Sequence, residues 1–157
     1  MMKKLFWIMS LMLLCNCMPK YFLPLPKKNA SNERIDKARS FAEYYYNKCN
    51  TKDFSEIQGY VMDVNTKKFG FSPEEIEKYC SRKTERYGKI TVGEFNKGLT
   101  VARPTDFYDY FIFKANLEKT DSLKYIVVGL FRDKDVIGGM RFTDTTNPKL
   151  VRTKRKK

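Results

Sequence analysis

The 157-residue chain has room for one domain of ordinary size. Hydrophobic residues make up 42% of it and aromatic residues 15%, a composition that excludes disorder throughout the chain. The net charge of +13 is concentrated at the ends, because residues 1–30 hold five Lys, residues 149–157 hold six Lys or Arg, and neither stretch holds an acid. The remainder has 20 basic and 18 acidic residues, so the folded part is nearly neutral, which argues against a nucleic-acid binder.

The sequence contains no histidine. This excludes a Ser-His-Asp triad, a Cys-His pair and a zinc site with imidazole ligands. The only closely spaced cysteines, Cys15 and Cys17, belong to the N-terminal segment. We therefore expect no metal, no cofactor and no assigned catalytic residue.

Residues 1–17 have the pattern of a secretion signal. Lys3 and Lys4 precede the apolar residues 5–14, a stretch too short for a spanning helix of about 20 residues. The sequence Leu14-Cys15-Asn16-Cys17 resembles a bacterial lipobox, in which a Leu stands three positions before the cysteine that becomes lipidated. The resemblance implies lipid attachment at Cys17.

This resemblance implies a lipoprotein of the bacterial cell envelope, anchored to a membrane by acyl chains such as palmitate. Met18 follows the cysteine in place of an acidic residue, which is similar to the pattern of outer-membrane forms in double-membrane bacteria. The alternative is a plain signal whose cleavage releases a soluble protein. Residues 18–30, rich in Pro and Lys, predict a semi-extended tether.

Helical periodicity begins at Ser31 and predicts three helices. The first has its apolar stripe at Ile35, Ala38, Phe41, Ala42, Tyr45 and Cys49. A capping-box pattern at 53–56 predicts a second, short helix with the apolar face Phe54, Ile57 and Val61. The third begins at Ser72, with Pro73 in its first turn, and ends at Gly88.

From residue 89 the apolar period becomes two, which predicts four strands. Their ranges are 89–96, 107–119, 123–132 and 136–143. Gly93 shifts the alternation of the first strand, as a β-bulge would. Short turns between the strands predict an antiparallel meander.

Three N-terminal helices packed on a curved four-stranded antiparallel sheet make an α+β fold. The element order, the Tyr87-Gly88-Lys89-Ile90 junction and the meander resemble the NTF2-like (cystatin-like) cone fold over residues 31–145, especially the small domains of bacterial lipoproteins. That leaves residues 146–157 as a basic tail. The tail either lies on an anionic membrane surface or polymer, or is a solvated end.

The NTF2-like resemblance implies a pocket between the concave face of the sheet and the helices. The candidate lining residues are Asp109, Tyr110, Tyr45, Phe111 and Phe113. By alternation Asp109 shares a face with Phe111 and Phe113, so it points inward and could act as a base for proton transfer. Alternatively, it lies at the open end of its strand, solvated or bonded to a helix terminus.

Cys49 and Cys80 remain in the chain after Cys17 is modified, and both fall on apolar stripes. In an oxidising compartment an even pair predicts a disulfide. Two buried free thiols, packed as small hydrophobic groups, are the alternative.

These observations favour an exported, membrane-tethered domain that binds a partner protein or a small apolar ligand without catalysis. One alternative is an enzyme of the same fold that uses an inward carboxylate. Another is an accessory subunit of an envelope assembly. Nucleic acid is not an expected partner, because export separates the protein from it and most aromatic residues fall on faces that build the core.

Overall fold

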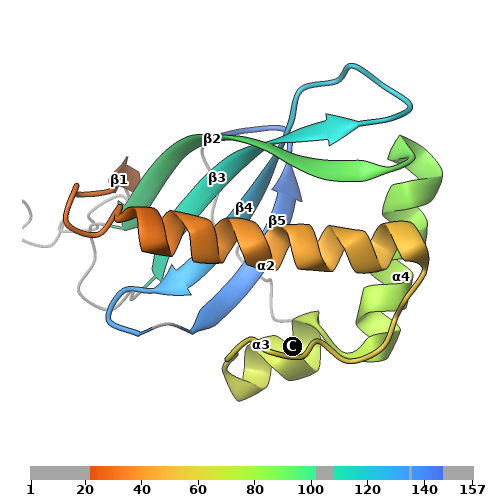
Figure 1. The fold of residues 1–157 in the computed structure, drawn as a ribbon, viewed down its shortest axis with the longest axis horizontal. Helices are drawn as coiled ribbons and strands as arrows, with labels where there is room; N and C mark the ends of the chain where they lie inside the picture. Colours follow the sequence, from red (N-terminus) through yellow and green to blue (C-terminus); the bar gives the residue numbers. More distant parts are fainter. Residues whose placement is uncertain (1–21, 102–107, 135, 147–157) are drawn as a thin grey trace, which may run out of the picture.

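The computed structural model describes residues 22–101, 108–134 and 136–146. This part contains the helices α2 (Asn32–Thr51), α3 (Val64–Gly70) and α4 (Pro73–Tyr87), as Figure 1 shows. Its strands are β1 (Phe22–Pro24), β2 (Ile90–Val101), β3 (Tyr108–Leu117), β4 (Lys124–Phe131) and β5 (Ile137–Thr143). The predicted signal with Cys17, the start of the tether and residues 147–157 of the basic tail lie outside the described residues.

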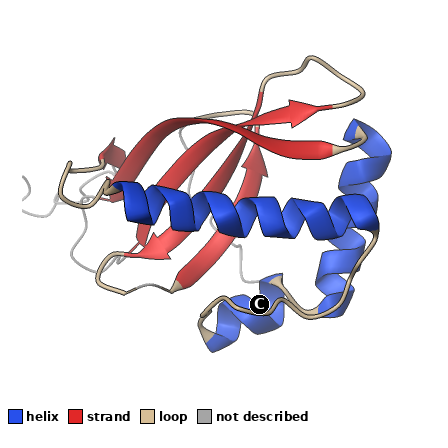
Figure 2. Cartoon of the chain, in the orientation of Figure 1, coloured by secondary structure: helices blue, strands red, loops and turns tan. Residues whose placement is uncertain are grey.

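The strands form one antiparallel sheet in the order β1-β2-β3-β4-β5. Helix α2 lies along one face of this sheet, and α4 stands across its far end (Figure 2). The α+β class and the antiparallel meander are confirmed. The number of strands is corrected from four to five, because β1 pairs with the end of β2 and Phe22 lies opposite Val101.

Helix α2 begins where the helical periodicity of the sequence begins. The Ser31 side chain accepts a hydrogen bond from the Arg34 backbone N–H at 3.4 Å. The helix ends at Thr51, and the next residue, Lys52, adopts a left-handed conformation with φ 57°. Its buried face includes Ala38, Phe41, Ala42, Tyr45 and Cys49, all on the predicted apolar stripe.

The second helix is not where the capping-box pattern predicts it. Asp53 accepts hydrogen bonds from the Ser55 N–H at 3.0 Å and from the Lys48 ammonium at 2.6 Å, so it forms a local turn and an ion pair. Gly59, with φ 78°, continues the irregular path. The helix begins only after Asp63, whose carboxylate caps Val64–Gly70 by accepting from two backbone N–H groups.

Helix α4 follows its prediction at both ends. Ser72 caps it, Pro73 occupies the first turn, and Gly88 ends it with φ 71°. A Cβ at Gly88 would lie 2.5 Å from the Glu118 carboxylate, so both backbone conformation and space require glycine there. The chain then enters β2 directly.

Strand β2 contains the expected irregularity. Its pairing with β3 shifts register between Val92 and Phe95, around Gly93, which confirms the predicted bulge. The Gly93 carbonyl freed from regular pairing accepts a hydrogen bond from the Arg39 guanidinium at 2.8 Å. Beyond the bulge the strand continues to Val101, because the second half pairs with both β1 and β3.

The main core lies between the sheet and the helices and is rich in aromatic rings. Its largest fully buried side chains from α2, β3 and β4 are Phe41, Tyr45, Tyr46, Phe111, Phe113, Ile126 and Leu130. A smaller cluster lies on the opposite face of the sheet: Leu99, Ile112, Tyr125 and Val127, with Phe22 and Tyr110 against it. Burial of the larger cluster supplies most of the hydrophobic stabilisation.

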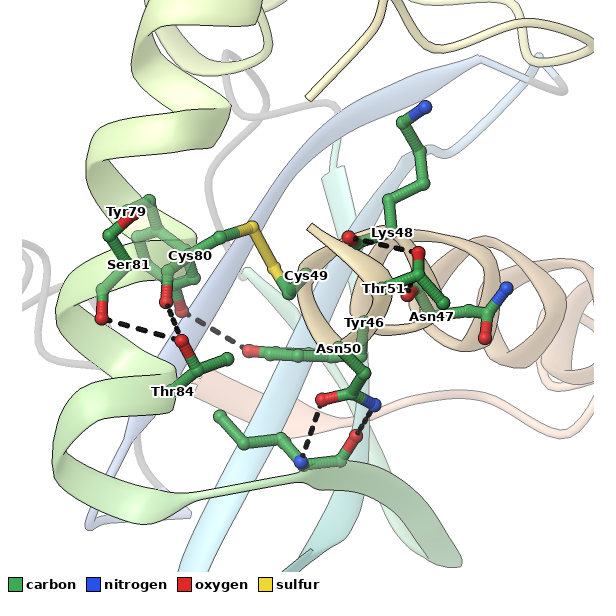
Figure 3. The surroundings of a disulfide bond; sticks show 11 residues. Tyr46, Asn47, Lys48, Cys49, Asn50, Thr51, Tyr79, Cys80, Ser81 and Thr84 are labelled. Atoms are coloured by element: carbon green, nitrogen blue, oxygen red, sulfur yellow. Dashed lines mark hydrogen bonds between the residues drawn. A yellow bond between two sulfur atoms is a disulfide. The ribbon is translucent and has the colours of Figure 1, made fainter. Parts of the chain in front are cut away.

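A disulfide joins α2 to α4 inside this core. Cys49 and Cys80, 2% and 0% exposed, are bonded, which confirms the disulfide prediction (Figure 3). The Tyr46 and Tyr79 hydroxyls form a second link between the helices at 3.1 Å. Asn50 then joins α2 to β2, because its side-chain amide donates to the Ile90 carbonyl and accepts from the Ile90 N–H.

Removal of the disulfide should destabilise the domain strongly. The two cysteines are 31 residues apart, for which the chain-entropy model gives about 3.7 kcal/mol. We expect the double variant Cys49→Ala/Cys80→Ala to lose roughly that free energy of unfolding in a denaturant titration. The wild type should weigh two protons less without reductant than with it. Two reactive thiols in the processed chain, denatured without reductant and lacking residues 1–16, with Cys17 acylated, would contradict the bond.

Candidate functional site

Asp109 is fully buried on the helix-facing side of β3. One carboxylate oxygen, Oδ2, accepts a hydrogen bond from Arg34 Nη1 at 2.7 Å. The other, Oδ1, accepts one from Arg132 Nε at 3.3 Å. We refer to Asp109, Arg34 and Arg132 as the Asp109 cluster.

The two arginines connect this carboxylate to the surrounding backbone. Arg34, in the first turn of α2, also donates to the carbonyls of Asn29 and Phe131 at 2.8 and 2.9 Å. Arg132, just after β4, also donates to the Thr100 hydroxyl at 2.7 Å and to the Val101 carbonyl at 3.3 Å. The cluster therefore joins the start of α2 to the ends of β2 and β4 and the start of β3.

This geometry does not suit a general base. A base needs an oxygen within hydrogen-bond reach of a substrate proton. Asp109 has no exposed surface, and each of its oxygens holds a guanidinium. Its chemistry is that of a buried, paired charge that fixes neighbouring elements.

The five candidate pocket residues do not come together. Tyr110 lies on the opposite face of the sheet from Asp109, where its ring packs edge-on against Phe22 with centroids 5.7 Å apart. Alternation along β3 separates these two neighbours, and the sequence alone was sufficient to show it. Tyr45 is eleven residues after Arg34, which places it about 16 Å further along α2.

Phe111 and Phe113 are packed as core residues. Both are 0% exposed and belong to the main core cluster. The guanidinium of Arg34 lies over the Phe111 ring at 5.3 Å, and that of Arg39 lies over the Phe113 ring at 4.9 Å. The inner face of β3 therefore packs against side chains of α2, including Arg34 and Arg39.

An apolar groove of about 370 Å³ lies elsewhere, between α3, α4 and the start of β5. Its side-chain walls come mainly from Tyr45, Phe69, Phe71, Tyr79 and Met140, with Gly138 and Gly139 along β5. Of the predicted candidates only Tyr45 lines it. The signal in the sequence was the Phe69-Gly70-Phe71 triplet, which was missed because the short helix was expected ten residues earlier.

The Tyr45 hydroxyl is one of the polar groups at this groove, which Asn65 and Thr66 also line. Tyr45 is 2% exposed, and its hydroxyl makes no hydrogen bond with the described residues. In that part of the chain every fully buried side-chain oxygen or nitrogen has a partner. The Tyr45 hydroxyl therefore retains contact with the groove that its residue lines.

Burial keeps the tyrosines at this site in their neutral form. Burial is the largest of the causes that raise the pKa of Tyr45 well above its usual value, and it is also the largest of those that raise the pKa of Tyr79 to about 12. The Tyr79 hydroxyl is already bonded to Tyr46, whereas that of Tyr45 remains available. At neutral pH the groove thus offers one phenol that can both donate and accept.

A larger and more polar hollow of about 790 Å³ lies beside the disulfide, between the ends of α2 and α4. Several of its polar groups are already used within the protein. Thr51 and Thr84 donate to the backbone of their own helices, Asn50 bonds to Ile90, and Glu118 accepts from the Lys89 N–H. These internal bonds make the hollow a weaker candidate than the apolar groove.

No group of three or more His, Cys, Asp or Glu within the described residues could hold a metal ion. Over the same ranges, no helix has the length and apolar character needed to cross a membrane.

Comparisons with protein-family models, curated proteins and solved structures found no match for this chain.

The Asp109 cluster generates a stability prediction. Replacing Asp109 by Ala leaves two guanidiniums without their shared anion, and breaking a buried pair in this way typically costs 3–5 kcal/mol. We expect Asp109→Ala to lower the free energy of unfolding by about that amount in urea. The exposed Asp121→Ala in the β3–β4 turn should change it by less than about 0.5 kcal/mol. Equal losses in the two variants would contradict the role assigned to the cluster.

Proposed function

We propose that this protein is an exported, membrane-tethered lipoprotein whose NTF2-like domain binds a small apolar ligand and catalyses no reaction. The observation that carries the proposal is the apolar groove with the neutral Tyr45 hydroxyl at its base. Its volume of about 370 Å³ falls in the usual range for small-molecule sites, about 300–1,000 Å³.

The walls of the groove suit an apolar molecule. Phe71 is 4% exposed and packs edge-on against Tyr45, with ring centroids 5.5 Å apart, so this wall is formed before any ligand arrives. Phe69, at the rim, is 70% exposed. A ligand in the groove would cover Phe69, and the burial of its surface would contribute to affinity.

The Tyr45 hydroxyl narrows the ligand class. A purely apolar ligand would bury this hydroxyl without a partner, at a cost of about 1–3 kcal/mol. The preferred ligand therefore has an apolar body and one hydrogen-bonding group at its inner end. Because the phenol is neutral, that group need not be charged.

The disulfide supports export. Disulfides persist in oxidising compartments and are rare in the cytosol, and Cys49–Cys80 is built into the core between two helices. It agrees with the secretion signal predicted at residues 1–17 and lipid attachment at Cys17. Helices packed on one face of an antiparallel sheet are consistent with an NTF2-like fold, an argument by analogy of fold alone.

A second candidate function has its own observation. Val61, Val64 and Phe69 are 64%, 80% and 70% exposed around α3, none of whose residues is buried. Large exposed apolar side chains of this kind are typical of protein-binding surfaces. They favour the alternative of an accessory subunit in an envelope assembly. The enzyme alternative is weakened, since its carboxylate is held by two arginines.

Filling the groove should abolish ligand binding. Gly70 lines the groove, and a Cβ added there would meet no atom within 4 Å, so Gly70→Leu adds a large apolar side chain at the groove wall without a backbone clash. We expect this variant to bind the probe N-phenyl-1-naphthylamine at least tenfold more weakly, measured by probe fluorescence. Tyr45→Phe should weaken binding about fivefold, the equivalent of one hydrogen bond of about 1 kcal/mol.

Val61→Ser is the matched control for these variants, because Val61 is exposed but does not line the groove. It should bind the probe like the wild type and would instead weaken a protein complex formed through α3. Wild-type affinity of Gly70→Leu for the probe would contradict ligand binding at the groove.

The anchor is tested separately. Radiolabelled palmitate fed to an expressing bacterial host should appear in the wild-type protein and in Cys15→Ala, and disappear in Cys17→Ala. The reason is the spacing of Leu14, three positions before Cys17. Label retained in Cys17→Ala would rule out this attachment site.

A further inference from the structure

Four basic residues gather where the second half of α4 meets the start of β4. They are Arg82, Lys83, Arg86 and Lys124, referred to below as the basic corner. Their mutual repulsion is strong enough to act on Lys83: burial is the main cause that lowers the pKa of its ammonium, and the charges of Arg82, Arg86 and Lys124 lower it further.

Lys83 is held in place by aromatic rings. Its Nζ lies 4.6 Å from the centroid of the Phe142 ring, and 5.5 and 5.6 Å from those of Tyr87 and Tyr79. Such rings attract an ammonium through their quadrupoles but carry no net charge. The ammonium is thus fixed in position with its positive charge uncompensated.

Acidic residues do little to offset this charge. Within the described ranges, no carboxylate forms an ion pair with Arg82, Lys83 or Arg86. The side chain of Lys124 is 19% exposed, and its nearest acid is Asp144, with 4.0 Å between Nζ and Oδ2. Asp144 is itself 77% exposed, so water screens this long contact.

The corner contains a small cavity. It has a volume of about 200 Å³ and is lined by Lys83, Tyr87, Lys124, Phe142, Thr143 and Asp144. Lysines from α4 and β4 thus line one concave site from two sides. The Thr143 hydroxyl accepts a hydrogen bond from the Thr145 N–H at 3.2 Å, so its own proton remains available to donate.

We propose that this cavity binds a phosphate group between the Lys83 and Lys124 ammoniums, with the Thr143 hydroxyl as an additional donor. A phosphate offers several strong acceptor oxygens and up to two negative charges, which matches two lysines with Arg82 and Arg86 nearby. A carboxylate has a single charge and would leave more of the repulsion in place. The site is separate from the apolar groove, and the inference does not depend on the proposed function.

The first test measures protection of individual lysines. The full chain is acetylated with N-hydroxysuccinimidyl acetate in sodium phosphate or in sodium chloride of equal ionic strength, and modified peptides are counted by mass spectrometry. We expect phosphate to slow acetylation of Lys83 and Lys124 at least fivefold. Lys78, exposed on the same helix, should react equally in both salts.

A second measurement uses variants. Lys83→Met keeps an unbranched apolar chain between the three rings and removes the charge. Phosphate should raise the unfolding temperature of the wild type and of Lys78→Met by several degrees more than chloride does. That difference should be absent in Lys83→Met and Lys124→Met. A full phosphate effect in Lys83→Met would overturn the proposal.

The source of the phosphate is distinguished with vesicles. The same acetylation is repeated on vesicles of phosphatidylcholine alone and with phosphatidic acid added. Protection of Lys83 by phosphatidic acid but not by inorganic phosphate would assign the site to a lipid headgroup, and the reverse would assign it to a soluble phosphate. Protection by both would support the phosphate group itself. If neither protects Lys83, or if Lys78 is protected equally, the proposal is wrong.

Discussion

The placement of α2 on the sheet depends on one buried carboxylate. An ionised group taken out of water without a partner costs far more than a domain of this size can tolerate, so Asp109 must keep its two guanidiniums. Those guanidiniums come from the start of α2 and the end of β4. The charge requirement therefore holds the first turn of the helix against the ends of three strands.

The other end of α2 is fixed by different chemistry. There the Cys49–Cys80 bond joins it to α4, and Asn50 joins it to the first residue of β2. A helix of 20 residues is about 30 Å long, so its two fixed ends lie well apart. Between these two ends, the aromatic residues of α2 pack on the sheet. The apolar groove lies beside the short α3, which carries no buried residue.

Much of the architecture could be predicted because it rests on local signals. Helices α2 and α4 have capping side chains and apolar stripes, and β3 to β5 alternate with short turns between them. The short helix was misplaced because a side chain like that of Asp53 can either cap a helix or form an ion pair. The capping-box pattern does not reveal that the Asp53 carboxylate pairs with Lys48. Strand β1 has only three residues, one of them a proline, which is too few to display a period.

The candidate groove was harder to predict, because segments far apart in the sequence come together to form it. The groove needs Phe69 and Phe71 from the end of α3, Tyr79 from α4 and Met140 from β5, and no spacing in the sequence relates these segments. Asp109 was rightly singled out as an unusual residue. What alternation along β3 could not supply was the identity of its partners, since Arg34 is 75 residues away in the chain.

Strand β1 also limits how far the domain can stand from a bilayer. If Cys17 carries the lipid, a flexible linker of residues 18–30 would reach about 45 Å when fully extended. Because Phe22 is already part of the sheet, only residues 18–21 remain as spacer, and they can span at most about 14 Å. The edge of the sheet formed by β1 would then face the headgroups at close range.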